Sequence, residues 1–150
     1  MDDIYSSLHV KGNHWVGMWI SIPRRHITLW DCATKHARNA DVKDAITPIC
    51  DILAYLIYIL AEHKETTPLT PFTYERRSDV PQNRQSGDCG IYCLKYIEAH
   101  ALDLPFDGKK LCDAKVKDIR EKLATDIFHE TEIRGNEPRD FMQADMYEAR

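Results

Sequence analysis

The sequence predicts an α+β domain in which a small antiparallel sheet packs against helices. Two neighbouring runs, at 14–22 and 26–31, are rich in aromatic and β-branched residues, which suit a pleated sheet. Helical patterns follow at 47–63, 89–102 and 113–130. Because the two strand patterns come before the helices instead of alternating with them, their order favours an α+β fold over a parallel α/β fold.

The composition is that of one ordinary globular domain. Of the 150 residues, 43% are hydrophobic and 29% are charged. We expect the domain to cover residues 1–130 and a polar, poorly ordered tail to follow at 131–150. A formal net charge of -4 argues against a nucleic-acid-binding protein. We interpret the basic pairs Arg24–Arg25 and Arg76–Arg77 as solvated surface.

Neither a membrane span nor an export signal is predicted. The longest apolar stretch, at 52–61, is shorter than the roughly 20 residues that cross a bilayer. The N-terminus carries acids where a secretory signal carries bases, so we expect an intracellular protein with no membrane partner. Five cysteines are an odd number without framework spacing, which predicts free thiols.

The first two strand runs predict an antiparallel hairpin, because a Pro-Arg-Arg turn separates them. A turn centred between residues 22 and 24 places residue 14 opposite a residue in the low thirties. His14 and Asp31 should therefore be neighbours. A carboxylate beside an imidazole fixes its tautomer and stabilises its charged form. A lone histidine at a strand end is usually structural, so the pairing is what indicates a functional site.

The segment 47–63 predicts a helix that is covered over most of its surface. Thr47 is the expected N-cap, and Pro48 is the expected first helical residue, where a proline loses no intrahelical hydrogen bond. Neighbouring tyrosines widen an apolar stripe that should face the core. The stripe is formed by Ile49, Ile52, Leu53, Leu56 and Leu60.

The second half of the chain predicts a short strand at 72–76 and two further helices. The helix at 89–102 has Asp88 as its expected N-cap. The helix at 113–130 carries an amphipathic i, i+3, i+4 pattern. That pattern is formed by Val116, Ile119, Leu123 and Ile127.

Cys89 stands where a polar loop turns into the second of these helices. Unpaired N–H groups and the positive end of the helix dipole stabilise a thiolate at such a position. The alternative is a small apolar core residue, which is the role expected of Cys93 one turn later. In the preceding loop, the amide of Gln82 could stabilise an oxyanion together with the backbone N–H of Cys89, and Gln85 is a competing candidate.

Two segments, "HWVGMWISIPRRHITLWD" and "VPQNRQSGDCGIYCLKYIE", resemble the Ulp1-type cysteine proteases, and the plant Ulp1-like sequences in particular. That family has a His-Trp pair, an Asp on the next strand, and a Gln shortly before Asp-Cys-Gly. Here these elements are His14–Trp15, Asp31, Gln82 and Asp88–Gly90. The resemblance extends over roughly residues 4 to 129 and implies a papain-like cysteine proteinase fold.

The resemblance also implies a role for each residue. Cys89 would attack a carbonyl carbon, His14 would be its general base, and Asp31 would orient His14. Gln82 would stabilise the oxyanion, and Trp15 would help to form a narrow channel around two glycines. The implied activity is hydrolysis after the Gly-Gly terminus of a small ubiquitin-like, SUMO-like modifier. No cofactor or metal is implied, and we expect a monomer in the nucleus or cytoplasm.

Two departures from the family pattern bear on this interpretation. The loop from Gln82 to Cys89 is one residue longer than in many relatives. The family's catalytic domain also has a sizeable substrate-binding segment before the His, whereas thirteen residues precede His14. We therefore expect a C-terminal portion of the catalytic domain, truncated at its N-terminus. A non-catalytic module that binds the modifier is the alternative.

Two other kinds of protein are disfavoured by the sequence. A metal site would have to use Cys89, Cys93, His100 and Cys112, and the spacing C-x₃-C on a helix is poor for structural zinc. A DNA-associated transposon protein would be expected to carry a basic stripe, which the acidic balance of the chain does not provide.

Overall fold

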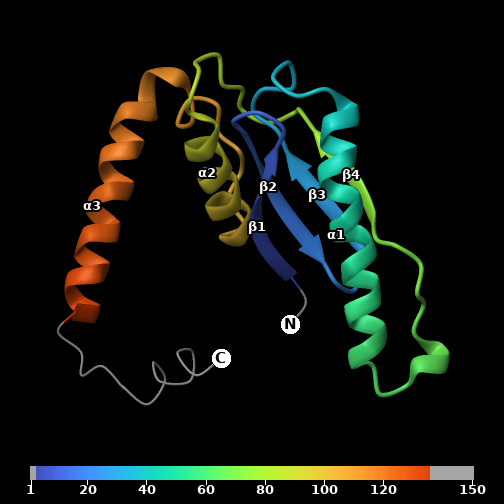
Figure 1. Ribbon diagram of the computed structural model, residues 1–150. Coiled ribbons are helices and arrows are strands. Elements are labelled where there is room, and N and C mark those ends of the chain that lie inside the picture. The colour runs from blue at the N-terminus through green and yellow to red at the C-terminus, as the bar shows by residue number, and fades with distance from the viewer. Residues whose placement is uncertain (1–2, 136–150) are drawn as a thin grey trace. The chain divides into compact units, whose positions relative to one another are not determined.

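The computed structural model describes residues 3–135 of the chain, with side chains up to 131. The chain divides into two units, Met1–Val116 and Lys117–Arg150, and each is described by itself. The first unit contains the whole sheet, two long helices and every residue of the candidate site (Figure 1). Most of the helix α3 (Val116–Gly135) belongs to the second unit. Residues 131–135 of the expected tail are therefore helical, and the rest of that tail lies outside the described residues.

The sheet has four strands in the order β1-β2-β3-β4. They are β1 (Asp3–Val10), β2 (His14–Ser21), β3 (His26–Trp30) and β4 (Thr73–Arg77). The α+β class is confirmed, but the sheet is mixed and not wholly antiparallel, because β4 pairs parallel to β3. The chain reaches β4 from β3 through the long helix α1 (Asn39–Leu60), and such a crossover is what a parallel pair requires.

The hairpin predicted from the two aromatic runs is confirmed. Gly17 pairs with Trp30 and Ser21 pairs with His26 in the antiparallel β2–β3 register. Continuing this register brings residue 14 level with residue 33, just beyond Asp31. The strand β1 was not predicted, and it pairs along its full length with β2 through a turn at Gly12, whose φ is +88°. Its alternation is weak because only Leu8 and Val10 are buried.

The helix α1 begins eight residues before the predicted start, at Asn39. Its first turn is fixed by Asp41, whose carboxylate accepts the backbone N–H of Arg38 at 3.2 Å. Thr47 is therefore not an N-cap, and Pro48 lies inside the helix. The hydroxyl of Thr47 instead donates to the carbonyl of Lys43 at 2.8 Å, one turn earlier.

The face of α1 that packs on the sheet also differs from the predicted one. Small and β-branched residues at intervals of four are buried, namely Val42, Ile46, Cys50 and Ala54. Three residues of the predicted stripe, Ile52, Leu56 and Leu60, are exposed. The other two residues of that stripe, Ile49 and Leu53, pack against the core cluster, so the prediction is confirmed for these two only.

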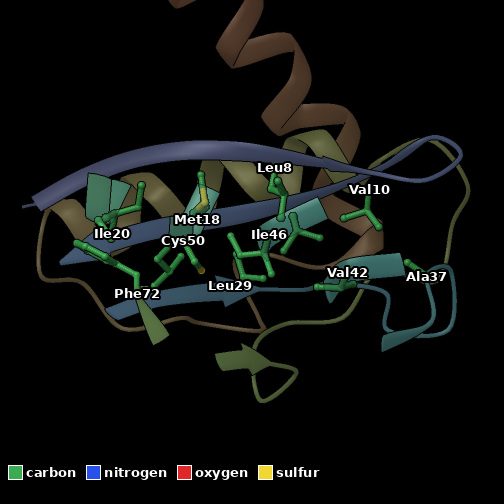
Figure 2. Packing of buried hydrophobic residues seen from close by; sticks show 13 residues of the cluster. Leu8, Val10, Met18, Ile20, Leu29, Ala37, Val42, Ile46, Cys50 and Phe72 are labelled. Carbon is green, nitrogen blue, oxygen red and sulfur yellow. The ribbon is translucent and has the colours of Figure 1, made fainter. Parts of the chain in front are cut away.

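The two faces of the sheet are covered by different helices. Alternate residues of β2, such as Met18 and Ile20, enter a hydrophobic cluster with β3 and α1 (Figure 2). The intervening residues face α2 (Cys89–Ala101), as the ring contact between Trp19 and His100 shows. At Gly17 a Cβ would lie 3.3 Å from the Trp30 ring and 3.5 Å from the Cys93 carbonyl oxygen. Glycine therefore allows α2 to approach the strand closely.

The remaining elements are two short 3-10 turns, Lys64–Thr66 and Asp113–Lys115. The predicted short strand at 72–76 and the predicted helix at 89–102 are both confirmed, within one residue at each end. Asp88 is the N-cap residue of α2, although its side chain makes no capping hydrogen bond. Within residues 3–135, no helix has the length and apolar character needed to cross a bilayer.

Candidate active site

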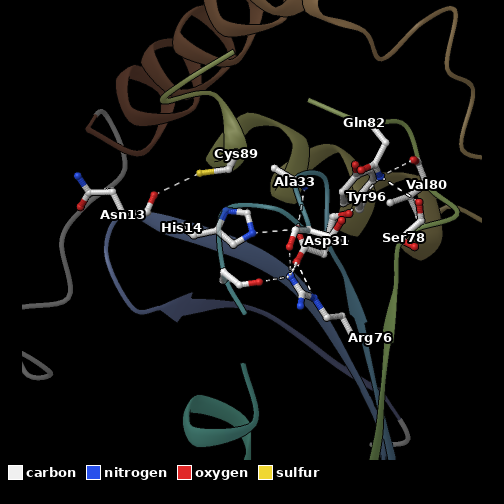
Figure 3. A network of polar contacts seen from close by, with 12 residues as sticks. Asn13, His14, Asp31, Ala33, Arg76, Ser78, Val80, Gln82, Cys89 and Tyr96 are labelled. Carbon is white, nitrogen blue, oxygen red and sulfur yellow. Dashed lines mark hydrogen bonds and ion pairs between the residues drawn. The ribbon is translucent and has the colours of Figure 1, made fainter. Parts of the chain in front are cut away.

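The first residue of β2 and the first residue after β3 form a buried polar pair. His14 Nε2 lies 2.8 Å from Asp31 Oδ1, and the two residues are 2% and 0% exposed (Figure 3). The predicted proximity of His14 and Asp31 is thus confirmed. Because the carboxylate accepts the Nε2 proton, the neutral imidazole carries its lone pair on Nδ1. That Nδ1 atom is buried and has no hydrogen-bond partner among the described residues.

Asp31 is held as a carboxylate by donors on both of its oxygens. Oδ1 also accepts the backbone N–H of Ala33 at 2.8 Å, and Oδ2 accepts Arg76 Nε at 2.8 Å and Nη2 at 2.5 Å. Burial alone would raise the pKa of Asp31. The hydrogen bonds from His14, Ala33 and Arg76 outweigh burial, so the pKa lies below its ordinary value. Asp31 is therefore ionised at neutral pH.

Arg76 corrects one interpretation of the sequence. The pair Arg76–Arg77 was interpreted as solvated surface, but the Arg76 side chain is only 11% exposed and binds Asp31. Arg77 fits the interpretation, since its side chain is 46% exposed and pairs with Asp79. The two arginines differ because successive residues of a strand point to opposite faces. No local pattern marked Arg76, since its partner lies 45 residues earlier in the chain.

Cys89 is the first residue of α2 and is 5% exposed. Its thiol donates to the carbonyl oxygen of Asn13, at 3.5 Å, and not to His14. Figure 3 shows its side chain beside the His14 ring, on the side away from Asp31. The thiol is therefore bound to the carbonyl of the residue that precedes His14, at a helix N-terminus whose dipole favours a negative charge.

Two other cysteines near Cys89 are unsuited to nucleophilic chemistry. Burial raises the pKa of Cys32 to about 12, and the negative charge of Asp31 adds to this effect. Burial also raises the pKa of Cys93 to about 12. Both thiols are therefore protonated at neutral pH, and Cys93 packs in the core as predicted.

Backbone carbonyl groups bind the side-chain amide of Gln82. Its Nε2 lies within hydrogen-bond distance of three carbonyl oxygens, those of Asp31 at 3.2 Å, Ser78 at 3.0 Å and Val80 at 2.9 Å. These bonds tie the loop to the end of β3 and leave no amide proton for a substrate. In this structure the Gln82 amide is thus engaged by backbone carbonyls, and both Gln82 and its competitor Gln85 are exposed.

The neighbouring Asn83 has the properties expected of such a donor. It is 6% exposed, and its Nδ2 atom is buried without a hydrogen-bond partner among the described residues. Its Oδ1 accepts the backbone N–H of Gln85 at 2.8 Å, which fixes the orientation of the amide. Its backbone N–H donates to the carbonyl of Cys32 at 2.8 Å, directly after Asp31. Sequence reasoning missed this residue.

A signal for Asn83 was present in the sequence. The loop from Gln82 to Cys89 is one residue longer than the family pattern, and counting from Asn83 removes the extra residue. Gln82 was preferred because it is the glutamine that the family pattern names, although an asparagine amide carries the same donors.

The other predicted residues are placed as follows. Trp15 follows His14 on β2, is 41% exposed, and has its ring centroid 4.8 Å from that of His9.

Within residues 3–135 no group of three or more His, Cys, Asp or Glu side chains could hold a metal ion. His100 Nδ1 lies 2.8 Å from the hydroxyl of Tyr5, and its ring contacts Trp19.

An imidazole that is held by a buried carboxylate, beside a cysteine at a helix N-terminus, is the arrangement used by thiol hydrolases. The profile described as "Ulp1 protease family, C-terminal catalytic domain" matches residues 1–134. The chain therefore belongs to the Ulp1 protease family.

Solved structures of Ulp1 share this fold. The SUMO protease Ulp1 with its catalytic cysteine oxidised to a sulfenic acid is 21% identical, with a TM-score of 0.61 over 87% of this chain and 54% of that one. The C-terminal Ulp1 protease domain in complex with Smt3, the yeast ortholog of SUMO, is 22% identical, with a TM-score of 0.54 over 80% of this chain and 49% of that one. This chain thus spans about half the length of these structures. A comparison with curated protein sequences finds no match.

Proposed function

We propose that this protein hydrolyses the peptide or isopeptide bond that follows the Gly-Gly terminus of a small ubiquitin-like modifier. The observation that carries the proposal is the state of His14, whose Nε2 is held by Asp31 while its buried Nδ1 has no partner among the described residues, with the Cys89 side chain beside the ring in Figure 3. Membership of the Ulp1 protease family supports this reaction, and the solved complex of Ulp1 with Smt3 supports this class of substrate.

The reaction needs one rearrangement of the thiol. The Cys89 hydrogen leaves the carbonyl of Asn13 and is transferred to Nδ1 of His14, which becomes an imidazolium beside Asp31. The thiolate then attacks the carbonyl carbon of the terminal glycine, and its electron pair forms the new C–S bond. The imidazolium returns the proton to the leaving amine as the C–N bond breaks. Water then hydrolyses the thioester, with His14 as the base.

Asn83 takes the role that the sequence suggested for Gln82. A buried amide nitrogen without an acceptor, such as Asn83 Nδ2, costs about 1–3 kcal/mol in the free protein, and a developing oxyanion would supply the missing acceptor. The backbone N–H of Cys89, at the start of α2, is the second donor. The exposure of Trp15, which follows His14 on β2, supports a role in contacting the residues before the scissile bond.

The substrate assignment is tested with two matched fusion proteins. Each carries a SUMO-type modifier joined through its C-terminus to a reporter, and they differ only in a Gly-Gly or an Ala-Ala pair before the junction. We expect the Gly-Gly fusion alone to be cut, with the modifier released at the second glycine, as mass spectrometry would show. Modifier that binds in calorimetry but is never cut would instead identify a non-catalytic binding module. Equal cleavage of the Ala-Ala fusion would contradict the Gly-Gly channel.

Replacing Asn83 by alanine should lower kcat by about 10²-fold with little change in KM, because the oxyanion exists only in the transition state. The matched control is Gln82→Ala, whose amide binds three backbone carbonyls. That variant should lose thermal stability while the folded fraction retains its kcat. Steady-state kinetics and thermal unfolding of both variants check this assignment, and the reverse pattern would restore Gln82 as the donor.

A further inference from the structure

Arg76 and the imidazole of His14 bind the same carboxylate from opposite sides. Oδ1 of Asp31 accepts His14 Nε2 and the N–H of Ala33, while Oδ2 accepts two nitrogens of the Arg76 guanidinium. Every oxygen thus has two donors. The carboxylate cannot rotate about its Cβ–Cγ bond without breaking hydrogen bonds on both oxygens.

We propose that Arg76 is a positioning residue of the active site, which holds Asp31 in the orientation that binds His14 and offsets part of its negative charge. The inference rests on the proposed function for its catalytic meaning. Its geometry and electrostatics can be tested without a substrate.

The guanidinium is itself fixed by the loop that carries Asp31. It donates to the carbonyl of Thr34 at 3.2 Å, to the carbonyl of Ala37 at 3.0 Å and to Oδ1 of Asn39 at 2.6 Å. Arg76 therefore joins β4 to the segment between β3 and α1, as Figure 3 shows for its bonds to Asp31. A lysine could supply the charge but not the planar set of donors.

Among the described residues, four titratable or charged groups surround the His14 imidazole or its carboxylate partner. Asp31 after β3 favours a protonated imidazole, and so would a thiolate of Cys89 on α2. Arg76 on β4 opposes it through the shared carboxylate. His36, whose ring centroid lies 5.8 Å from that of His14, would also oppose it when protonated. Removing the Arg76 cation leaves the full charge of Asp31 facing His14, so the imidazole should retain its proton to higher pH.

The first experiment compares Arg76→Gln and Arg76→Lys with Arg77→Gln as the control on the same strand. The NMR titration of the His14 imidazole is followed in the full chain, with the signal assigned by its loss in His14→Gln. Arg76→Gln should move the titration curve to higher pH by about one unit, whereas Arg76→Lys should move it less and Arg77→Gln not at all. On a modifier fusion, both Arg76 variants should lower kcat by about 10²-fold and leave KM nearly unchanged.

The second experiment uses the open cavity of about 610 Å³ that Arg76 lines together with Tyr74 and Ser78. Truncation in Arg76→Ala enlarges this cavity toward Asp31, so millimolar guanidinium should enter it and restore part of the lost kcat. A folded Arg76→Gln variant whose His14 titration curve overlays that of the parent would overturn the proposal. This result is independent of cleavage, so it is distinct from a parent chain that cuts no modifier, which would refute the proposed function instead.

Discussion

Serine in place of Cys89 will lower turnover of a modifier fusion by roughly 10⁴-fold or more, because a hydroxyl is a far weaker acid than a thiol beside the same base. The fold should persist. Serine is close to cysteine in size, and its hydroxyl can donate to the carbonyl of Asn13 as the thiol does. Binding of the modifier should therefore be retained, and calorimetry on the variant would measure it without cleavage.

The matched control for this variant is Cys112→Ser. Cys112 is half-buried, and its thiol lies 3.8 Å from the carbonyl oxygen of Lys109, whereas the Cys89 thiol is bound beside His14. Its replacement should leave kcat unchanged. A modifier probe with a C-terminal vinyl sulfone should label the parent and Cys112→Ser, but not Cys89→Ser. Parental turnover by Cys89→Ser would show that another residue is the nucleophile.

Alanine in place of Asp31 will have the largest effect on stability, with an expected loss of about 3–5 kcal/mol in the free energy of unfolding. Asp31 is fully buried. Its removal leaves the guanidinium of Arg76, whose side chain is only 11% exposed, without its carboxylate partner. His14 also loses its partner on Nε2 and becomes free to rotate. Turnover should fall as well, although less than after replacement of His14, since Asp31 acts through the imidazole.

A double-mutant cycle identifies the cause of this loss. Urea unfolding of Asp31→Ala, Arg76→Met and the double variant should show that the double variant is more stable than the sum of the single losses predicts. The reason is that removing both members of a buried ion pair leaves no unpaired charge. Strict additivity of the two losses would contradict a direct coupling between Asp31 and Arg76.

The pH dependence of stability gives a further check on Asp31. Its pKa is lower in the folded protein than in the unfolded chain, so its contribution to stability is complete above the unfolded value, about 4, and is lost as the pH falls through the folded value. Unfolding of the parent should therefore become easier below about pH 4. Asp31→Asn should lack this part of the acid sensitivity.

The sequence was most informative where the signals are local. The β2–β3 hairpin follows from two aromatic runs and a proline-containing turn, and its geometry brings His14 to Asp31. The start of α2 at Cys89 follows from a polar loop and an N-cap residue. In each case the residues that decide the structure lie within a few positions of one another, or across one short turn.

Tertiary structure decided the rest, because the deciding contacts join distant segments. Pro48 predicted a helix start. However, Val42 and Ile46 pack in the core, so α1 begins before Pro48, at Asn39. The parallel register of β3 and β4 brings Arg76 to Asp31 across 45 residues, and no local pattern encodes that register. Gln82 and Asn83 are adjacent amides with the same donors. Only the tertiary surroundings distinguish them. Three backbone carbonyls bind Gln82 Nε2, whereas Asn83 Nδ2 has no partner among the described residues and is the candidate oxyanion donor.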